Sequence, residues 1–318
     1  MSATLLVIIG LLGLVVGGEM LVRGAVSVAK SFGISPMVIG LTLVGFGTST
    51  PELVTSLQAA LSGSSGIAIG NVIGSNIGNI LLILGIAALL APVAVDPKAF
   101  RRDGTVMVLA TILCLAAVMV GDIGRLAGAG LFCALLIYLG FTLWSEMRGG
   151  GTPAGAVYES ESEAVPGHDH TLGVSLALAC AGLVITIFGA RFLVSGAVTL
   201  AQIAGLSETV IGLTIVAIGT SMPELVTAII AVRKGQSDVA LGNVIGSNIF
   251  NILCILGVTA MVQPMAIPPE IAKLDIWVLC AATLVLLIFA RTGWTISRRE
   301  GSLFAAAYAT YLAVLLLF

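Results

Sequence analysis

The sequence predicts an all-α membrane protein whose chain crosses the bilayer ten times. Hydrophobic residues occupy 58% of the 318 positions and charged residues only 9%, a composition that excludes a soluble globular domain. Apolar stretches long enough to cross about 30 Å of hydrocarbon recur along the whole chain, separated by short charged connections. Because lipid offers no hydrogen bonds and the stretches lack the alternation of a membrane barrel, each is expected to be a helix.

The predicted spans form two five-helix units. They are expected at 4–30, 35–61, 66–91, 104–121, 124–146, 173–203, 207–232, 238–262, 274–291 and 300–318. Residues 148–172 are rich in Gly, Pro and acidic residues and predict a flexible cytoplasmic linker between units 1–147 and 173–318. The amino terminus lacks the basic region of a secretory signal, so the first helix is expected to remain. Five cysteines without paired spacing indicate neither disulfides nor a metal site.

Lys and Arg residues predict the orientation of the ten spans. The odd-numbered connections carry ten of these residues, whereas the even-numbered connections carry only Arg125 and Lys273. Because cytoplasmic loops are enriched in Lys and Arg, both termini are expected on the extracytoplasmic side.

An internal duplication relates the two units. A shift of 172 residues aligns them without a gap, with 34 identities in the 53 positions from Gly33 to Gly85. The best-matched pairs are GTSTPELVTS (47–56) with GTSMPELVTA (219–228), and GNVIGSNIGNIL (70–81) with GNVIGSNIFNIL (242–253). Since five helices per unit is an odd number, equivalent helices must cross in opposite directions. Such inverted repeats are typical of transporters with a binding site near the midplane.

Three carboxylates fall well inside predicted spans, at an insertion cost of about 2.5–3.5 kcal/mol each. Glu19 has Arg23 one helical turn away and aligns with Arg191, so an ion pair is expected there. Glu52 and Glu224 occupy equivalent positions and have no Lys or Arg nearby in their helices. A cation is therefore expected to visit these two glutamates.

Prolines next to these glutamates predict interrupted helices. Pro51 and Pro223 lack an N–H group, and their rings push against the carbonyls of Gly47 and Gly219 four residues earlier. Opened main-chain carbonyls would then face the carboxylates.

Oxygen-bearing side chains share one face of each motif helix. Four pairs are four residues apart: Thr48 and Glu52, Thr220 and Glu224, Ser75 and Asn79, and Ser247 and Asn251. Carboxylates, amides and hydroxyls without Cys or His suit hard cations such as Ca²⁺ and Na⁺. The alternative is that these small polar residues serve only helix packing in lipid.

The paired GTS-x-PE and GNVIGSN-I-x-N segments resemble the two alpha repeats of the cation/calcium exchanger superfamily, in its sodium/calcium exchanger branch. The resemblance implies ligands from both repeats: Thr48, Ser49, Glu52, Ser75, Asn79, Thr220, Ser221, Glu224, Ser247 and Asn251, with main-chain oxygens of Gly45 and Ala217. It also implies a protein of the prokaryotic plasma (inner) membrane that exchanges three Na⁺ for one Ca²⁺ electrogenically, without a cofactor, nucleic acid or an obligate protein partner. Many relatives have Asp where Asn251 stands, which makes potassium co-transport less expected.

Three other functions compete with sodium/calcium exchange. A proton/calcium antiporter of the same superfamily would load the glutamates with protons, although the two asparagines favour sodium. A cation channel fits carboxylates in broken helices less well. An intramembrane hydrolase with Ser49 or Ser221 as nucleophile is disfavoured, because no His lies in any predicted span to act as base. The chain is therefore expected not to be an enzyme.

Overall fold

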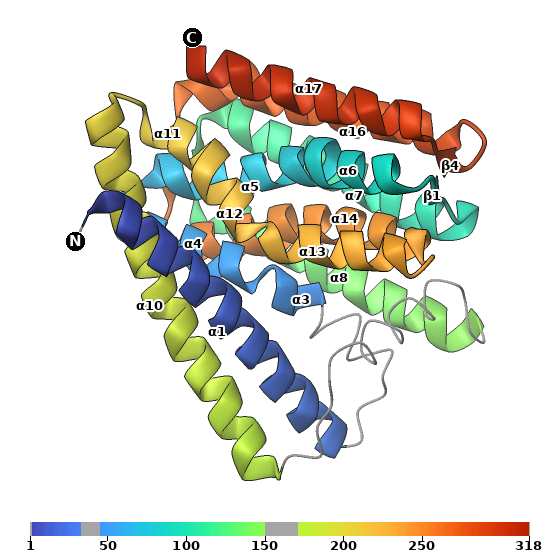
Figure 1. Cartoon of the computed structure of the whole chain (residues 1–318), viewed down its shortest axis with the longest axis horizontal. Coiled ribbons are helices and arrows are strands. Elements are labelled where there is room, and N and C mark those ends of the chain that lie inside the picture. The colour runs from blue at the N-terminus through green and yellow to red at the C-terminus, as the bar shows by residue number, and fades with distance from the viewer. Residues whose placement is uncertain (1, 33–44, 150–170, 318) are drawn as a thin grey trace.

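A computed structural model describes residues 2–32, 45–149 and 171–317, and Figure 1 shows most of them in helices. The helices, including short π-helical segments marked η, are α1 (Ala3–Ser31), α3 (Gly45–Thr48), α4 (Thr50–Leu61), α5 (Ser65–Gly78), η2 (Asn79–Ile83), α6 (Leu84–Leu90), α7 (Pro97–Val120), α8 (Arg125–Gly149), α10 (Leu172–Ala204), α11 (Glu208–Ile211), η3 (Gly212–Val216), α12 (Ala217–Thr220), α13 (Met222–Arg233), α14 (Ser237–Phe250), η4 (Asn251–Leu256), α15 (Gly257–Val262), η5 (Ile271–Asp275), α16 (Ile276–Arg291) and α17 (Arg298–Leu317).

Most of the predicted spans have a matching helix. Within the described ranges, eight helices are long and apolar enough to cross a membrane, and a ninth forms if α11–α12 and α13 are counted as one bent span. These nine match nine of the ten predictions. The remaining span, 35–61, starts in residues outside the described ranges, and α3 and α4 form its described part. Most of the linker predicted at 148–172 also lies outside them, although α8 continues to Gly149.

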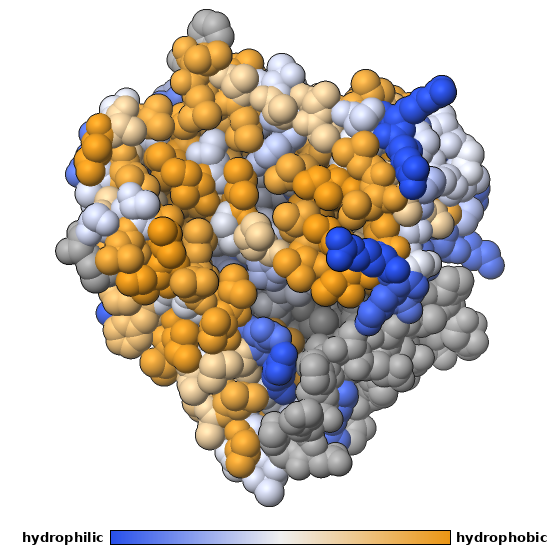
Figure 2. Space-filling model, viewed as in Figure 1, coloured by the Kyte–Doolittle hydropathy of each residue, from blue (hydrophilic) through white to orange (hydrophobic). Residues whose placement is uncertain are grey.

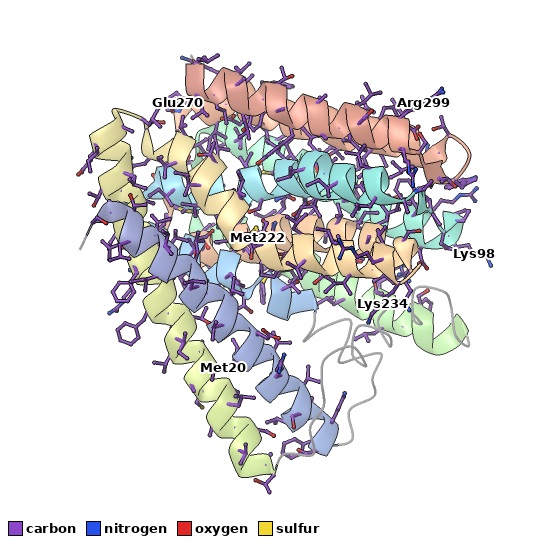
Figure 3. All side chains as sticks on the ribbon, viewed as in Figure 1. Met20, Lys98, Met222, Lys234, Glu270 and Arg299 are labelled. Carbon is purple, nitrogen blue, oxygen red and sulfur yellow. The ribbon has the colours of Figure 1, made fainter. Side chains whose placement is uncertain are left out.

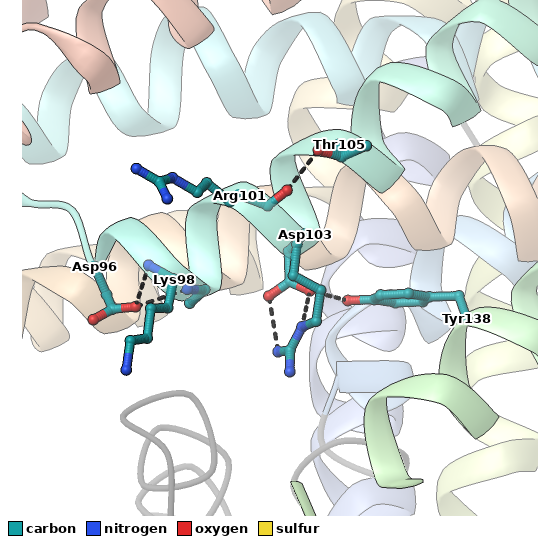
Figure 4. Close-up of polar contacts among 8 residues, drawn as sticks. Asp96, Lys98, Arg101, Asp103, Thr105 and Tyr138 are labelled. Carbon is teal, nitrogen blue, oxygen red and sulfur yellow. Dashed lines mark hydrogen bonds and ion pairs between the residues drawn. The ribbon is translucent and has the colours of Figure 1, made fainter. Parts of the chain in front are cut away.

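Helix α7 begins inside the charged stretch that was predicted to be a connection, so the expected start at 104 is wrong. Asp96 caps the helix by accepting a hydrogen bond from the backbone N–H of Lys98 at 3.0 Å. Asp103 pairs with Arg102 at 2.8 Å and accepts a hydrogen bond from Tyr138 of α8 at 3.0 Å (Figure 4). The cap at Asp96 and the partners of Asp103 stabilise these first turns, and the helix extends beyond its apolar part.

Two small strand pairs depart from the predicted all-α fold. β1 (Val93–Ala94) pairs with β4 (Thr295–Ile296), and β2 (Asp122–Ile123) pairs with β3 (Met265–Ala266), both antiparallel. A shift of 172 residues places β1 on β3, so the two pairs are related by the duplication. Each joins a connection of one half to a connection of the other, outside the apolar spans.

Helices α1 and α10 form a separate pair that runs diagonally to the remaining long helices (Figure 1). Their contacts are antiparallel, since Gly10 lies against Leu193 and Gly24 lies against Ala179. Glycines line the seam at intervals of seven residues: Gly10, Gly17 and Gly24 on α1, and Gly182, Gly189 and Gly196 on α10. A Cβ atom on Gly182 would come within 2.4 Å of the backbone nitrogen of Leu21, so only glycine permits this approach.

The centre of the molecule consists of the two helices that carry the GNVIGSN motifs. Residues Ser65–Leu90 (α5, η2 and α6) and Ser237–Val262 (α14, η4 and α15) are 83% and 78% buried in their most apolar stretches. The corresponding figures for the other six unbroken spans are 22–39%. These two spans are therefore enclosed by protein, and the outer ones present their side chains to lipid.

The outer surface fits a lipid environment. Figure 2 shows a largely apolar face whose most hydrophilic residues lie mainly towards one side. In Figure 3, Lys98, Lys234 and Arg299 lie at one end of the helices, and Glu270 lies at the opposite end. Large apolar side chains such as Leu126 and Ile137 are 91% and 73% exposed. An apolar belt with basic residues at one end is typical of an integral membrane protein.

Candidate ion-binding site

Two broken helices carry the predicted ligands. The first repeat breaks at Ser49, between α3 and α4, and the second breaks at Ser221, between α12 and α13. The backbone dihedrals are nearly the same at the two breaks, with φ −88° and ψ 7° at Ser49, and φ −84° and ψ 9° at Ser221. The second break bends the chain by 45°. The predicted interruption is therefore confirmed, and it falls two residues before each proline.

The break in the second repeat lies between the two ends of the helix bundle. Figure 3 places Met222, the first residue of α13, between the end marked by Lys234 and the end marked by Glu270. The carboxylates that follow the breaks are thus within the depth of the apolar spans.

Glu52 and Glu224 are buried, each only 1% exposed, and each is held by a serine of the other repeat. Ser221 donates a hydrogen bond to Oε1 of Glu52 at 3.0 Å, and Ser49 donates one to Oε1 of Glu224 at 3.3 Å. The hydroxyl of Thr48 is a further hydrogen-bond partner of Glu224. The two motifs thus meet crosswise at one site, and both carboxylates belong to it.

Several buried oxygens at this site have no hydrogen-bond partner. These unpartnered atoms are Oε2 of Glu52, Oε2 of Glu224, Oγ of Ser75, Oδ1 of Asn79 and Oδ1 of Asn251. Unpartnered buried polar atoms are rare in proteins, because each costs free energy. All five lie on residues predicted as cation ligands, and all are the acceptor atoms that Ca²⁺ and Na⁺ require.

The remaining predicted ligands have varied surroundings. Thr220 is buried and donates a hydrogen bond to Oδ1 of Asn71 at 3.0 Å. The carbonyl of Ala217 already accepts hydrogen bonds from the N–H of Ser221 at 3.1 Å and from Thr220 at 3.3 Å. Ser247 is buried, and its hydroxyl lies 3.5 Å from Oδ1 of Asn243.

Gly45 is the first residue of α3, one turn before Thr48, just as Ala217 is the first residue of α12, one turn before Thr220.

Four elements, α5, η2, α14 and η4, carry the remaining predicted ligands. Ser75 and Asn79 lie on α5 and η2, which contact α12 and α13, whereas Ser247 and Asn251 lie on α14 and η4, which contact α3 and α4.

Among the described residues, the site contains two carboxylates and no positive side chain that would compensate their charge. In the described part of the chain, the one charged group that interacts with Glu52 is Glu224 itself. Two adjacent carboxylates in a buried, low-dielectric region require cations or protons to balance them. Glu19 is different, because it pairs with Arg23 on α1 and its side chain is 58% exposed. The predicted ion pair of Glu19 is confirmed.

Sequence reasoning missed one buried acid and undervalued two asparagines. Asp275 is 1% exposed and accepts a hydrogen bond from Tyr311 at 2.8 Å. It was missed because the predicted span starts only one residue earlier, although a shift of 172 aligns it with Asp103. Asn71 and Asn248 were not predicted as site residues, but both are buried and bonded to predicted ligands.

Broken membrane helices that converge on buried carboxylates and unpartnered oxygens define a polytopic membrane transporter. Residues 2–144 and 174–317 match the family described as sodium/calcium exchanger protein. The chain belongs to this family, whose members are exchangers and not enzymes and need no cofactor.

Individual relatives resemble the chain over nearly its whole length. The putative antiporter CaxA of Alkalimonas amylolytica is 40% identical, with 97% of each chain covered. Sodium/calcium exchanger MaX1 of Methanosarcina acetivorans is 37% identical, with 98% of this chain and 97% of MaX1 covered. A solved structure of the sodium-calcium exchanger NCX_Mj, soaked with Na⁺ and Sr²⁺, superposes on this chain with a TM-score of 0.65. The two sequences are 34% identical, and the match covers 98% of this chain and 99% of the NCX_Mj chain.

Proposed function

We propose that this chain exchanges Na⁺ for Ca²⁺ by alternating access at one site between its two halves. The ligands are the side chains of Thr48, Ser49, Glu52, Ser75, Asn79, Thr220, Ser221, Glu224, Ser247 and Asn251, with the carbonyls of Gly45 and Ala217. The observation that carries the proposal is the reciprocal bonding of each glutamate by the other repeat's serine, which leaves one oxygen of each carboxylate unpartnered.

The charge of the site supports coupled exchange. One Ca²⁺ or two Na⁺ neutralises Glu52 and Glu224, whereas an empty site leaves two carboxylates in a low dielectric, which is strongly disfavoured. The unloaded carrier therefore does not change its accessibility, and transport in one direction requires transport in the other. With three Na⁺ per Ca²⁺ the loaded site gains one positive charge, and the exchange is electrogenic.

The arrangement of α1 and α10 supports inverted repeats covering residues 1–147 and 173–318, joined by the linker. These equivalent helices run antiparallel, as the duplication requires. Helix α1 also lies against both broken helices, since a Cβ on Gly47 would come within 2.2 Å of Val22, and one on Gly219 within 2.3 Å of Leu11. Movement of α1 and α10 along the central helices would then expose the site to one side or the other.

The distribution of basic residues supports the proposed orientation. Lys98, Lys234 and Arg299 mark one end of the molecule, and the start of α1 and the end of α17 lie at the opposite end (Figures 1 and 3). Under the positive-inside rule, both termini are then extracytoplasmic. A relative that is 38% identical, the inner membrane protein YrbG of Escherichia coli, supports the same membrane.

Counter-ion dependence of ⁴⁵Ca²⁺ uptake by proteoliposomes tests the function. Vesicles loaded with Na⁺ and diluted into Na⁺-free medium should accumulate ⁴⁵Ca²⁺, and uptake should be faster with a membrane potential positive inside if three Na⁺ leave for each Ca²⁺ that enters. Potassium should have little effect, because an amide stands at Asn251.

Two controls distinguish the competing functions. Uptake driven equally well by a proton gradient in the absence of Na⁺ would indicate a proton/calcium antiporter. Non-saturating Ca²⁺ flux without any counter-ion would indicate a channel. Either result would overturn the proposed exchange of Na⁺ for Ca²⁺.

A further inference from the structure

Two asparagines outside the proposed ligand set connect the two halves of the ion site. Asn71 lies on α5 and Asn248 on α14, and they are 0% and 1% exposed. Each is bonded to a proposed ligand that the other repeat contributes: Asn71 to Thr220, and Asn248 to Asn79. Buried amides at such positions either fill space or fix the orientation of their partners.

The contacts of Asn248 determine which end of the Asn79 amide faces the ions. Only the amide oxygen can bind a cation, because the NH₂ group is a donor. Nδ2 of Asn79 donates a hydrogen bond to Oδ1 of Asn248 at 3.1 Å. Oδ1 of Asn79 is thereby directed away from Asn248, and it is one of the unpartnered buried oxygens.

Asn71 acts on two ligands at once. Its Oδ1 lies 3.0 Å from the hydroxyl of Thr220 and accepts its single proton together with the carbonyls of Val216 at 3.0 Å and Ala217 at 3.3 Å. A hydroxyl that donates its proton in this way keeps its lone pairs for a cation. The Nδ2 group of Asn71 donates to the carbonyl of Glu52 at 3.2 Å and to Ser56 at 2.9 Å, which ties the start of α4 to α5.

The equivalent asparagines of the opposite repeats lack this complete bonding. Nδ2 of Asn243, the counterpart of Asn71, has no partner, and its Oδ1 accepts only a long bond of 3.5 Å from Ser247 of the same helix. Nδ2 of Asn76, the counterpart of Asn248, donates to the carbonyl of Val72 at 2.7 Å, and its Oδ1 has no partner. The amides are the same, so the difference arises from the residues around them.

The anchors of the two asparagines explain this asymmetry. Ser56, which accepts from Asn71, is replaced by Ala228 in the second repeat. Met107 of α7, whose sulfur lies 3.9 Å from Nδ2 of Asn248, aligns with Leu279. The sequence thus supplies a hydroxyl beside Asn71 and a thioether sulfur, which is a weak acceptor, beside Asn248, whereas Ala228 and Leu279 at the equivalent positions offer no acceptor.

We propose that Asn71 and Asn248 are positioning residues that orient ligand oxygens across the repeat interface without touching the ions. This inference rests on the proposed ion site. It predicts that each asparagine contributes to ion affinity through its hydrogen bonds and not through its volume.

Equilibrium ⁴⁵Ca²⁺ binding to the purified protein in detergent tests the inference. Asn248→Leu keeps the size of the side chain but removes the acceptor, and it should weaken Ca²⁺ binding about 10-fold or more, as expected when a buried hydrogen bond is lost. Asn71→Leu should likewise weaken binding about 10-fold or more.

Matched variants keep the test independent of folding. Asn243→Leu and Asn76→Leu, at the incompletely bonded counterparts, should weaken binding by less than about threefold. In sodium-driven uptake, the Leu variants at 71 and 248 should raise the KM for Ca²⁺ with little change in kcat. Equal losses at the counterpart positions would overturn the inference.

The same assay separates this inference from the function on which it rests. If the wild type binds no Ca²⁺, the proposed site itself is wrong. If the wild type binds Ca²⁺ and the Leu variants at 71 and 248 bind it equally well, the site stands and the positioning role is refuted. If those variants fold less well, Ser56→Ala and Met107→Leu provide a milder test, because each introduces the residue found at the equivalent position of the other repeat. Both should weaken Ca²⁺ binding severalfold, and unchanged binding by both would refute the positioning role.

Discussion

Replacement of Glu52 by Gln tests the shared carboxylate site most directly. Glu52 is 1% exposed, its Oε1 accepts a hydrogen bond from Ser221 at 3.0 Å, and its Oε2 has no partner. Gln has nearly the same shape and can keep the bond from the serine. The substitution therefore removes one negative charge and leaves the packing almost unchanged.

The expected loss follows from the charge balance of the site. Two carboxylates neutralise one Ca²⁺, whereas one carboxylate leaves a net positive charge in a buried region. Removing one partner of a buried charged pair costs about 3–5 kcal/mol, which corresponds to roughly a hundred- to several-thousand-fold weaker Ca²⁺ binding. Glu224→Gln should produce a loss of the same order, because Glu224 is equally buried.

The assays are equilibrium ⁴⁵Ca²⁺ binding and sodium-driven uptake, with the amount of folded protein measured by size-exclusion chromatography. Glu19→Gln is the matched control, since Glu19 is also a carboxylate within a span but pairs with Arg23 on the same helix. A pair of this i, i+4 type contributes about 0.3–0.5 kcal/mol, so activity should change by less than about threefold. Ca²⁺ binding by Glu52→Gln within about fivefold of the wild type, or an equal loss for Glu19→Gln, would refute the shared-site reasoning.

Three other changes test the packing and the chemistry of the site. Gly182→Leu should lower the Tm, because its Cβ would lie 2.4 Å from the backbone nitrogen of Leu21 and would force α1 and α10 apart. The control Gly173→Leu should leave the Tm nearly unchanged, because a Cβ there meets nothing within 4 Å. Tyr311→Phe removes the hydrogen-bond donor of buried Asp275 and should lower the free energy of unfolding by about 1–3 kcal/mol in a denaturation assay. Tyr138→Phe should lower it by less than about 1 kcal/mol, because Asp103 keeps its ion pair with Arg102. Protons compete with cations for the site carboxylates, so initial rates of sodium-driven ⁴⁵Ca²⁺ uptake should fall as the pH is lowered below neutral, and a rate that rises instead would contradict this.

The duplication and the apolar runs made most of the fold predictable. Long hydrophobic segments must be helical in lipid, so nine of the ten spans could be predicted. Most of their ends lie within a few residues of the predicted ones. The start of α7 could not, because Asp96 and the paired charges around Asp103 stabilise helical turns that hydropathy assigns to a connection. The two-residue strands were also missed, since such short segments have no periodic pattern.

The candidate site was predictable in its composition but not in its hydrogen bonds. Pro51 and Pro223 indicate where the helices break, and the spacing of four residues indicates which side chains share a face. Spacing within one helix carries no information on contacts between repeats. The crosswise bonds of Ser49 to Glu224 and of Ser221 to Glu52 therefore required the structure.

Equivalent asparagines differ in their bonding although the twelve-residue motifs around them differ at only one position, Gly78 against Phe250. The reason is that the amide partners lie on other elements. Asn71 has the hydroxyl of Ser56 on α4, and Asn248 has the sulfur of Met107 on α7, whereas the equivalent positions hold Ala228 and Leu279, which offer no acceptor. Duplicated ligands can therefore differ in how firmly they are oriented. It follows that the two halves of the site need not bind the same ion equally well, even though the five proposed ligand side chains of one half are identical to those of the other.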